Sequence, residues 1–555
     1  MKTAILLPLA LSIPLHAAAA APAPAPAAPS SSSASASAAA PKLVVVMAVD
    51  GLPQEQVVRY RDQFGQGGLR RLLDGGAWFS DAHQAHGTTV TAVGHAAILT
   101  GAYPNQHGIV ANNWVDRATG QQVYCTEDRA HKYIGEETEP ADGTSPARLR
   151  VDTLGDQLRY ATGNRAKVIA VSGKDRGAIL LAGKGGTAYM YMEGSGNFAS
   201  STWYMQQHPQ WVQRYQAGKP QDRYYGQKWR PLLAGSAYAN DAEGPLFDFS
   251  YYSEGGKPDA DYYKRLKTGP AIDELTLDFA RAAIEGETLG ANPAGVPDLL
   301  GVSLSGHDYV NHGFGPESAM SHDHLQRLDR MLAGFFSYLD KRVGADGWMI
   351  VLTADHGFAN SAEFSRQQRI DAGRVDGKKL MAGLEQHLAA TFDGAKPVMN
   401  AVLPNIYFDS AAIGKAGLKR ADVEAAARQW LLAQAGIADV YTRTRFEESG
   451  ATGTRQDLLM RRGWHRHESG DLVVVTRPYW AFGSGNSGAT HGTPYRYDTS
   501  VPLIMMGRRW IAPGNYTQYA EVVDIAPTLA AVLQVRAPAG AEGRVLTEAL
   551  RKSAR

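Results

Sequence analysis

The sequence predicts an α/β fold: a central, mostly parallel sheet sandwiched by helices, with cap segments inserted into it. Three continuous apolar runs carry this prediction, because strands that are covered on both faces are apolar along their whole length. The runs span residues 43–49, 299–305 and 348–354. Between the second and the third, apolar residues recur at helical spacing over 325–339, as a crossover helix packed on a sheet requires.

The rest of the chain extends this pattern. An apolar run at 501–506 and a helix at about 522–533 complete the α/β order. A catalytic domain is expected over 42–555, and its length exceeds what one hydrophobic core usually organises. Residues 185–295, rich in Tyr, Trp and Gly, and residues 365–480 fit the pattern badly. We expect both stretches to be cap insertions beside the active site.

The N-terminal residues have the composition of an export signal. Residues 1–21 combine a positive start, an apolar stretch and small residues suited to cleavage. The apolar stretch is shorter than the roughly 20 residues that cross a bilayer and contains two prolines, which favours a cleaved signal peptide over a membrane anchor. Residues 22–41 contain only Ala, Pro and Ser and predict a disordered spacer. The expected location is periplasmic or extracellular, without stable membrane insertion.

Charge and cysteine content exclude several classes of partner and scaffold. The chain has 56 Lys and Arg against 55 Asp and Glu, so its formal net charge of +1 offers no basic stripe for a nucleic acid. Its single cysteine, Cys125, cannot form an intramolecular disulfide. The sequence does not indicate an oligomeric state.

An aspartate follows each of the three apolar runs. Asp50, Asp308 and Asp355 should converge, because the carboxyl ends of neighbouring parallel strands meet at one edge of the sheet, where open α/β sheets bind ligands. A lone aspartate at such a place is commonly a turn residue or a helix cap. Three together, two of them with histidines nearby, favour a metal site.

Three histidines accompany these carboxylates. His312 lies four residues after Asp308, His356 directly follows Asp355, and His491 lies in a glycine-flanked loop. Imidazole and carboxylate ligands without a thiolate suit zinc, and the set is large enough for two Zn²⁺ ions. Six further histidines are more often surface or core residues and are left out of the ligand set: His83, His86, His95, His307, His322 and His324.

Two such ions typically activate a nucleophile and hold a leaving oxygen in an in-line displacement. Thr91 opens a short predicted helix that Gly101 ends, so its hydroxyl would lie at the positive helix end, where a phosphoryl group is favoured. Thr91 could equally be a helix cap alone, and Thr88 and Thr89 are competing nucleophiles.

The chain resembles the alkaline phosphatase superfamily through an ordered set of motifs. They are Val49-Asp50-Gly51, Thr91-Ala92-Val93-Gly94-His95, Leu99-Thr100-Gly101 with Pro104 and His107-Gly108-Ile109, Asp308 with His312, Thr353-Ala354-Asp355-His356-Gly357, Thr490-His491-Gly492 and Val523–Leu529. The threonine is typical of the nucleotide pyrophosphatase/phosphodiesterase branch and of the phosphate-irrepressible bacterial alkaline phosphatases.

The resemblance implies roles for these residues. One zinc would be held by Asp50, Asp355 and His356 and would contact Thr91, and the other would be held by Asp308, His312 and His491. Asn112 would contact a phosphoryl oxygen, with the adjacent Asn113 as the obvious misassignment. Val93 replaces a proline that is frequent in the family and removes no catalytic group.

The fragment Lys174-Asp175-Arg176 resembles a Lys-x-Arg element of the bacterial monoesterases, which the diesterase branch usually lacks. Lys174 and Arg176 follow a strand-like run, so alternation would point both side chains at one target and turn Asp175 away. Two cations and Asn112 match the three free oxygens of a phosphate monoester better than a diester. Without the resemblance, both cations would be read as solvated surface charges.

The sequence therefore predicts a secreted zinc-dependent alkaline phosphatase that hydrolyses small phosphate monoesters through a phosphothreonine. A phosphodiesterase or nucleotide pyrophosphatase is the nearest alternative, because its metal ligands and nucleophile would be the same. A non-catalytic metal- or phosphate-binding protein is disfavoured, since no ligand position is vacant. The sulfatase pattern is absent around Thr91.

Overall fold

The computed structural model describes residues 39–242, 247–448, 453–485 and 488–552. The expected signal peptide at 1–21 and nearly all of the expected spacer at 22–41 lie outside the described residues. Within the described parts of the chain, no helix has both the length and the apolar character that a bilayer crossing needs.

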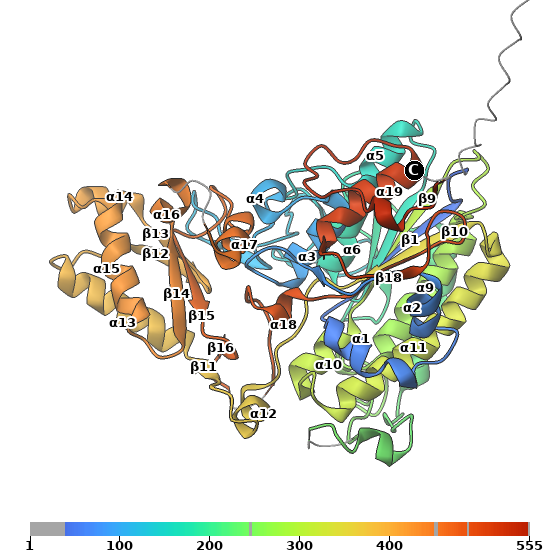
Figure 1. Cartoon of the computed structure of the whole chain (residues 1–555), viewed down its shortest axis with the longest axis horizontal. Coiled ribbons are helices and arrows are strands. Elements are labelled where there is room, and N and C mark those ends of the chain that lie inside the picture. The colour runs from blue at the N-terminus through green and yellow to red at the C-terminus, as the bar shows by residue number, and fades with distance from the viewer. Residues whose placement is uncertain (1–38, 243–246, 449–452, 486–487, 553–555) are drawn as a thin grey trace, which may run out of the picture. The chain divides into compact units, whose positions relative to one another are not determined.

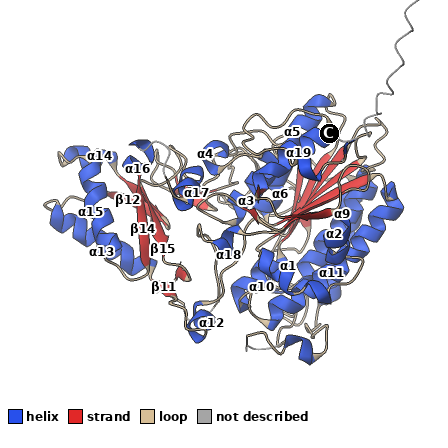
Figure 2. Cartoon of the chain, in the orientation of Figure 1, coloured by secondary structure: helices blue, strands red, loops and turns tan. Residues whose placement is uncertain are grey.

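A nine-stranded mixed sheet forms the centre of the fold (Figures 1 and 2). Its strands are, in spatial order, β18 (Gly514–Tyr516), β2 (Ala77–Phe79), β17 (Leu503–Met506), β10 (Trp348–Thr353), β1 (Leu43–Val49), β9 (Asp298–Leu304), β6 (Val168–Ser172), β7 (Thr187–Tyr191) and β8 (Phe198–Ala199). The four central strands β10, β1, β9 and β6 run parallel to one another. This confirms the predicted α/β class and the three apolar runs as strands.

Two layers of helices cover this sheet, as an α/β core requires. One layer contains α2 (Leu69–Gly75), α9 (Pro270–Glu287), α10 (Gly306–Phe314) and α11 (Ala319–Leu339). The other contains α3 (Thr91–Thr100), α5 (Leu154–Ala161), α6 (Asp175–Ala182) and α19 (Ile525–Leu533). The predicted crossover helix is α11, whose apolar stripe is buried, and the predicted final helix is α19 preceded by a 3₁₀ turn at Val522–Asp524.

The stretch 365–480 contains a second sheet with its own hydrophobic core. Its antiparallel strands are, in spatial order, β12 (Val398–Val402), β13 (Asn405–Phe408), β15 (Leu472–Thr476) and β14 (Ile437–Thr442). Helices α13 (Gly377–Thr391) and α15 (Arg420–Leu432) pack with it, and their leucines and valines form that core. A short parallel pair, β11 (Gly373–Val375) and β16 (Trp480–Phe482), extends this region.

The stretch 185–295 differs from the expected insertion. It supplies β7 and β8 to the main sheet, and α9 packs against β6 and β9. The aromatic residues that obscured this pattern are core residues: Phe279 of α9 stacks on Phe198 of β8 at 4.7 Å and contacts Tyr189 of β7. Aromatic residues fit a half-buried sheet surface, so their abundance here reflects packing on the main sheet.

The remaining elements connect these layers. They are α1 (Gln54–Arg59), β3 (Ala82–His83), α4 (Pro104–His107), β4 (Asn113–Val115), β5 (Gln122–Tyr124), α7 (Gln210–Ala217), α8 (Ala260–Arg265), α12 (Ala362–Gln367), α14 (Ser410–Lys415), α16 (Arg443–Glu448), α17 (Arg455–Gly463), α18 (Arg496–Thr499), β19 (Ala520–Glu521) and short 3₁₀ or π turns at Arg61–Gln63, Pro220–Tyr224, Gly235–Tyr238, Asp340–Gly344 and Thr547–Ala549.

Candidate active site

Four neighbouring strands end at one edge of the main sheet, and each is followed by a charged side chain. Asp50 follows β1, Asp308 lies in the first turn of α10 after β9, Asp355 follows β10, and Lys174 follows β6. All four residues are buried, with side chains at most 3 % exposed. The parallel register of these strands is what gathers charges that are far apart in the sequence.

The structure brings the six predicted ligand residues together as two groups of three. In the first group, Nε2 of His356 lies 3.5 Å from Oδ1 of Asp50 and 3.5 Å from Oδ2 of Asp355. In the second, Oδ1 of Asp308 lies 3.4 Å from Nε2 of His312 and 3.5 Å from Nε2 of His491. Ligand atoms about 2.0–2.2 Å from a tetrahedral zinc ion are separated by roughly 3.3–3.6 Å, so both spacings fit such an ion.

Each of the three histidines is held in the orientation that a metal ligand needs. The Nδ1 atoms of His312, His356 and His491 lie 2.8–2.9 Å from the carbonyl oxygens of Ala489, Gly357 and Thr89, respectively. A proton on Nδ1 donates to the carbonyl and leaves Nε2 unprotonated for a metal. The tautomer is therefore set by backbone groups of the site itself.

The unpaired buried atoms test whether metal ions fit here. Oδ1 of Asp50, Oδ1 of Asp308 and Nε2 of His356 are buried without a hydrogen-bond partner. Buried polar atoms are rarely left unpaired, because the cost is on the order of 1–3 kcal/mol each. Carboxylate oxygens and imidazole nitrogens without sulfur form a donor set suited to zinc, so the residues fit the predicted metal.

Lys174 lies between the two groups. Its Nζ is 2.5 Å from Oδ2 of Asp308 and 2.8 Å from Oδ2 of Asp50. Burial opposes ionisation of Asp308, but Lys174 and the nearby histidines hold the pKa of Asp308 well below its usual value. Burial and the neighbouring Asp355 raise the pKa of Asp50 well above its usual value despite Lys174. One ammonium group cannot balance three buried carboxylates, so the site has excess negative charge for cations.

Thr91 is the first residue of α3 and is 1 % exposed. A histidine one turn later joins this helix to the first ligand group: Nδ1 of His95 lies 2.9 Å from the carbonyl oxygen of Thr91 and 3.1 Å from Oδ2 of Asp355. Nε2 of His95 lies 2.8 Å from the Ser303 hydroxyl. The sequence interpretation left His95 out; its spacing of four residues from Thr91 was the available signal.

The competing hydroxyls have other environments. Thr89 donates its hydroxyl to the carbonyl oxygen of Thr493, 2.8 Å away, and so ties the turn before α3 to the loop that carries His491. Thr88 lines an apolar cavity beside that loop. Thr91 differs from both, because His95 connects its backbone to the metal-ligand candidate Asp355.

The adjacent residues Asn112 and Asn113 have different surroundings. Oδ1 of Asn112 accepts a 2.9 Å hydrogen bond from the backbone N–H of Ala92, which fixes its amide at the start of α3 beside Thr91. The NH₂ half of that amide remains the donor for an anionic ligand. Asn113 begins β4 and lines a separate cavity with Lys174 and Arg176.

The Lys-x-Arg element has a different backbone from the expected strand. β6 ends at Ser172 and α6 begins at Asp175, so Asp175 does not turn away. The Tyr124 hydroxyl donates to Asp175 over 2.6 Å, and Nη1 of Arg176 donates to the same hydroxyl over 3.1 Å. Tyr124, Lys174, Asp175 and Arg176 all border one cavity of about 870 Å³, so both cations of the element reach the same space.

The family model described as type I phosphodiesterase / nucleotide pyrophosphatase matches residues 44–496. The chain belongs to this family. Membership places it in the alkaline phosphatase superfamily, as the motifs predicted, and the matched span includes every predicted ligand, Thr91 and both cations of the Lys-x-Arg element.

Curated relatives of the family match over nearly their whole length. A protein from Myroides odoratus named calcium-transporting ATPase is 34 % identical over 92 % of this chain and 95 % of its own. The alkaline phosphatase PhoV of Synechococcus elongatus is also 34 % identical, over 92 % and 93 %. The alkaline phosphatase PafA of Elizabethkingia meningoseptica is 32 % identical, over 92 % and 94 %.

Solved structures agree with this assignment. The crystal structure of alkaline phosphatase PafA superposes with a TM-score of 0.84 at 32 % identity and covers 92 % of this chain and 99 % of its own. A murine ectonucleotide pyrophosphatase / phosphodiesterase 5 superposes with a TM-score of 0.52 at 13 % identity, which supports the common fold alone.

Proposed function

We propose that this chain is an alkaline phosphatase that hydrolyses small phosphate monoesters and releases inorganic phosphate. The observation that carries the proposal is the position of Lys174, whose Nζ lies between the two ligand groups, with Arg176 on the same cavity. The names of two relatives, PhoV and PafA, support the same activity.

Charge explains why this position favours a monoester. A transferred monoester group presents three free oxygens and a dianionic charge, whereas a diester presents one oxygen fewer and a single charge. Lys174 and Arg176 border one cavity, and the Asn112 amide is fixed at the start of α3, so all three would supply donors to the phosphoryl oxygens. Fixed donors in a site that excludes water interact most strongly with the more highly charged group.

Thr91 is the proposed nucleophile, with a phosphothreonine as the covalent intermediate. Its position at the start of α3 places an incoming anion against the positive end of the helix. Asn112 accepts from the Ala92 N–H and orients its own amide toward the phosphoryl oxygens. His95 holds the start of α3 against Asp355.

Two zinc ions are the proposed cofactors, and each ligand group would hold one. When bound, they would supply Lewis acidity that lowers the pKa of the threonine hydroxyl and stabilises charge on the leaving oxygen. Asp50, Asp355 and His356 would hold the ion beside Thr91, and Asp308, His312 and His491 would hold the other.

Phosphodiester hydrolysis is the second candidate, because the family description names it. Initial rates on an aryl phosphate monoester, an aryl phosphate diester and an aryl sulfate, measured with one preparation, separate the candidates. We expect kcat/KM to be highest for the monoester and lowest for the sulfate. A higher kcat/KM for the diester would replace the monoesterase proposal with the phosphodiesterase.

Export to the periplasm or the exterior is also proposed, from the charge and apolar pattern of residues 1–21. Intact-mass measurement on protein recovered outside the cytoplasm should find a start within the alanine-rich stretch. Recovery from the cytosol alone with Met1 retained would contradict it.

A further inference from the structure

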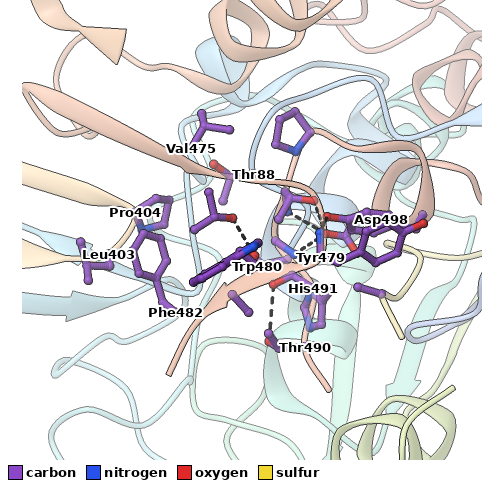
Figure 3. Close-up of a pocket in the computed structure, with 18 of the residues that line it drawn as sticks. Thr88, Leu403, Pro404, Val475, Tyr479, Trp480, Phe482, Thr490, His491 and Asp498 are labelled. Carbon is purple, nitrogen blue, oxygen red and sulfur yellow. Dashed lines mark hydrogen bonds between the residues drawn. The ribbon is translucent and has the colours of Figure 1, made fainter. Parts of the chain in front are cut away.

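A second cavity, of about 250 Å³, lies beside the group formed by Asp308, His312 and His491 (Figure 3). Its wall includes the turn 87–90 before α3, the loop 488–494, strands β15 and β16 of the second sheet region, and residues from 359–362, 374, 403–404 and 460. It is separate from the larger cavity that Lys174 and Arg176 border.

This cavity shares one residue, His491, with the second ligand group. The loop that carries His491 also contacts His312. Nδ1 of His312 lies 2.9 Å from the carbonyl oxygen of Ala489, and the Ala489 N–H donates to the carbonyl oxygen of His312 over 3.3 Å. A ligand in the cavity would therefore contact His491, one of the three residues that would hold the second ion.

The lining is largely aromatic and aliphatic. Trp480 and Phe482 of β16, with Tyr479 before them, are half-buried, and Leu403 and Val475 complete the apolar surface in Figure 3. Such surfaces favour apolar and aromatic ligand groups, which gain from burial and ring contacts.

The charged residues of the lining are already paired. Nη2 of Arg374 donates to Glu363 and to the carbonyl oxygen of Gly488, both over 2.8 Å. Oδ2 of Asp498 accepts from the N–H groups of Gly492 and Thr493 and from the Thr493 hydroxyl, over 2.6–3.0 Å. These bonds hold the loop in place and engage Arg374 and Asp498 within the protein.

We propose that this cavity binds the leaving alcohol of the substrate and selects phosphate monoesters whose alcohol carries one aromatic ring. The inference rests on the proposed phosphomonoesterase activity. Asp308, His312 and His491 would hold an ion that stabilises charge on the leaving oxygen, and the substituent on that oxygen would then lie on the side of His491 that faces Trp480 and the cavity. An apolar cavity of about 150 Å³ is enough for benzene, so about 250 Å³ accommodates one substituted ring.

Benzyl phosphate and methyl phosphate test this inference, because their leaving alcohols have nearly the same acidity and differ mainly in the ring. We expect kcat/KM for benzyl phosphate to exceed that for methyl phosphate by about tenfold or more. Trp480→Ala and Phe482→Ala should each reduce this ratio by about tenfold. Tyr160→Ala is the matched control, because this aromatic side chain on α5 is 80 % exposed and outside the cavity lining.

A second measurement does not depend on how well the variants fold. Benzyl alcohol should inhibit methyl phosphate hydrolysis by the unaltered enzyme competitively, and methanol at the same concentration should not. Equal use of the two substrates, or a benzyl preference that survives both substitutions in folded protein, would overturn the inference and leave the phosphatase proposal standing. Failure to hydrolyse either ester would instead refute the phosphatase proposal.

Discussion

The ammonium group of Lys174 lies 2.5 Å from Oδ2 of Asp308, a predicted metal ligand, although the two residues are 134 positions apart in the chain. Lys174 therefore belongs to the charge balance of the ligand groups as well as to the proposed phosphoryl site. This double role gives the first prediction.

Lys174→Ala combined with Arg176→Ala should narrow the ratio of monoester to diester kcat/KM. Removing one preorganised donor typically costs about 2.7–4 kcal/mol, or roughly a hundred- to a thousandfold in rate. The loss should be greatest for the dianionic group, and steady-state kinetics on paired aryl esters measures it. Lys378→Ala combined with Lys379→Ala, at two exposed lysines of α13, removes the same charge and is the matched control. Equal losses on both ester types would count against the assignment.

Thr91→Ala should lose several orders of magnitude in kcat while it keeps its fold and its zinc, because the substitution removes one hydroxyl and no carboxylate or imidazole. Acid-quenched peptide mapping of the unaltered enzyme should locate phosphate on Thr91. Thr88→Ala tests the competing hydroxyl, and it should keep far more of kcat than Thr91→Ala, because Thr88 lines the cavity proposed for the leaving alcohol. Label on Thr88 or Thr89 would move the nucleophile.

Chelation should abolish activity and lower the melting temperature, because it leaves Oδ1 of Asp50 and Oδ1 of Asp308 buried without a partner. Zinc should restore both properties. Magnesium at the same concentration should restore less, since it prefers an all-oxygen octahedral shell over a site with imidazoles. Elemental analysis alongside activity checks this, and full turnover by metal-free protein would refute the ligand assignment.

Gly94→Ala should destabilise the start of α3, because a β-carbon at this position would overlap the backbone carbonyl of Asp355. Backbone cannot move aside as a flexible side chain can, and overpacking costs about 1–3 kcal/mol. Thermal unfolding measures this loss. Gly414→Ala, in α14 with open space around it, should be neutral or stabilising by about 1 kcal/mol. Equal stability of the two variants would contradict the close approach.

The buried carboxyl group of Asp498 should make the stability of the fold depend on pH. Burial raises its pKa to about 7, against the opposing effect of its hydrogen bonds from Thr493 and Gly492. The folded state therefore keeps a proton that the unfolded chain releases near pH 4. The stabilisation from this group is complete below about pH 4 and is lost as pH rises to about 7, with a steepest slope of about 1.4 kcal/mol per pH unit.

Asp498→Asn removes this titration, so the difference in melting temperature between the variant and the unaltered protein should shift in favour of the variant from pH 5 to pH 8. Scanning calorimetry at constant ionic strength measures the difference. A constant difference across that range would show that Asp498 titrates near its ordinary pKa.

The carboxylates at the strand ends could be predicted from the sequence, because the pattern that identifies each of them lies within a few adjacent residues. A continuous apolar run followed by an aspartate identifies β1, β9 and β10, and their parallel pairing then follows from ordinary α/β topology. The i, i+4 spacing of Asp308 and His312 is equally local, and the structure indeed brings the two side chains within 3.4 Å.

Other features depend on contacts between distant segments. Nothing near Lys174 in the sequence indicates that β6 pairs with β9 and so places its ammonium group beside Asp308. Asp175 begins a helix where strand alternation was expected, because β6 ends two residues before Lys174. Aromatic content at 185–295 concealed β7 and α9, since burial against the main sheet, not local periodicity, determines those residues.

Residues from two regions line the cavity beside His491, and the two regions are stabilised by different contacts. Its metal-facing side comes from the loop that carries His491, whereas Val475 and Trp480 come from a region whose sheet has a hydrophobic core of its own. Replacements along β16 can therefore reshape the alcohol side of the cavity while every carboxylate and imidazole of the reaction centre keeps its neighbours. Related enzymes can therefore change which esters they hydrolyse through substitutions at a few positions of one short strand, while their catalytic residues stay the same.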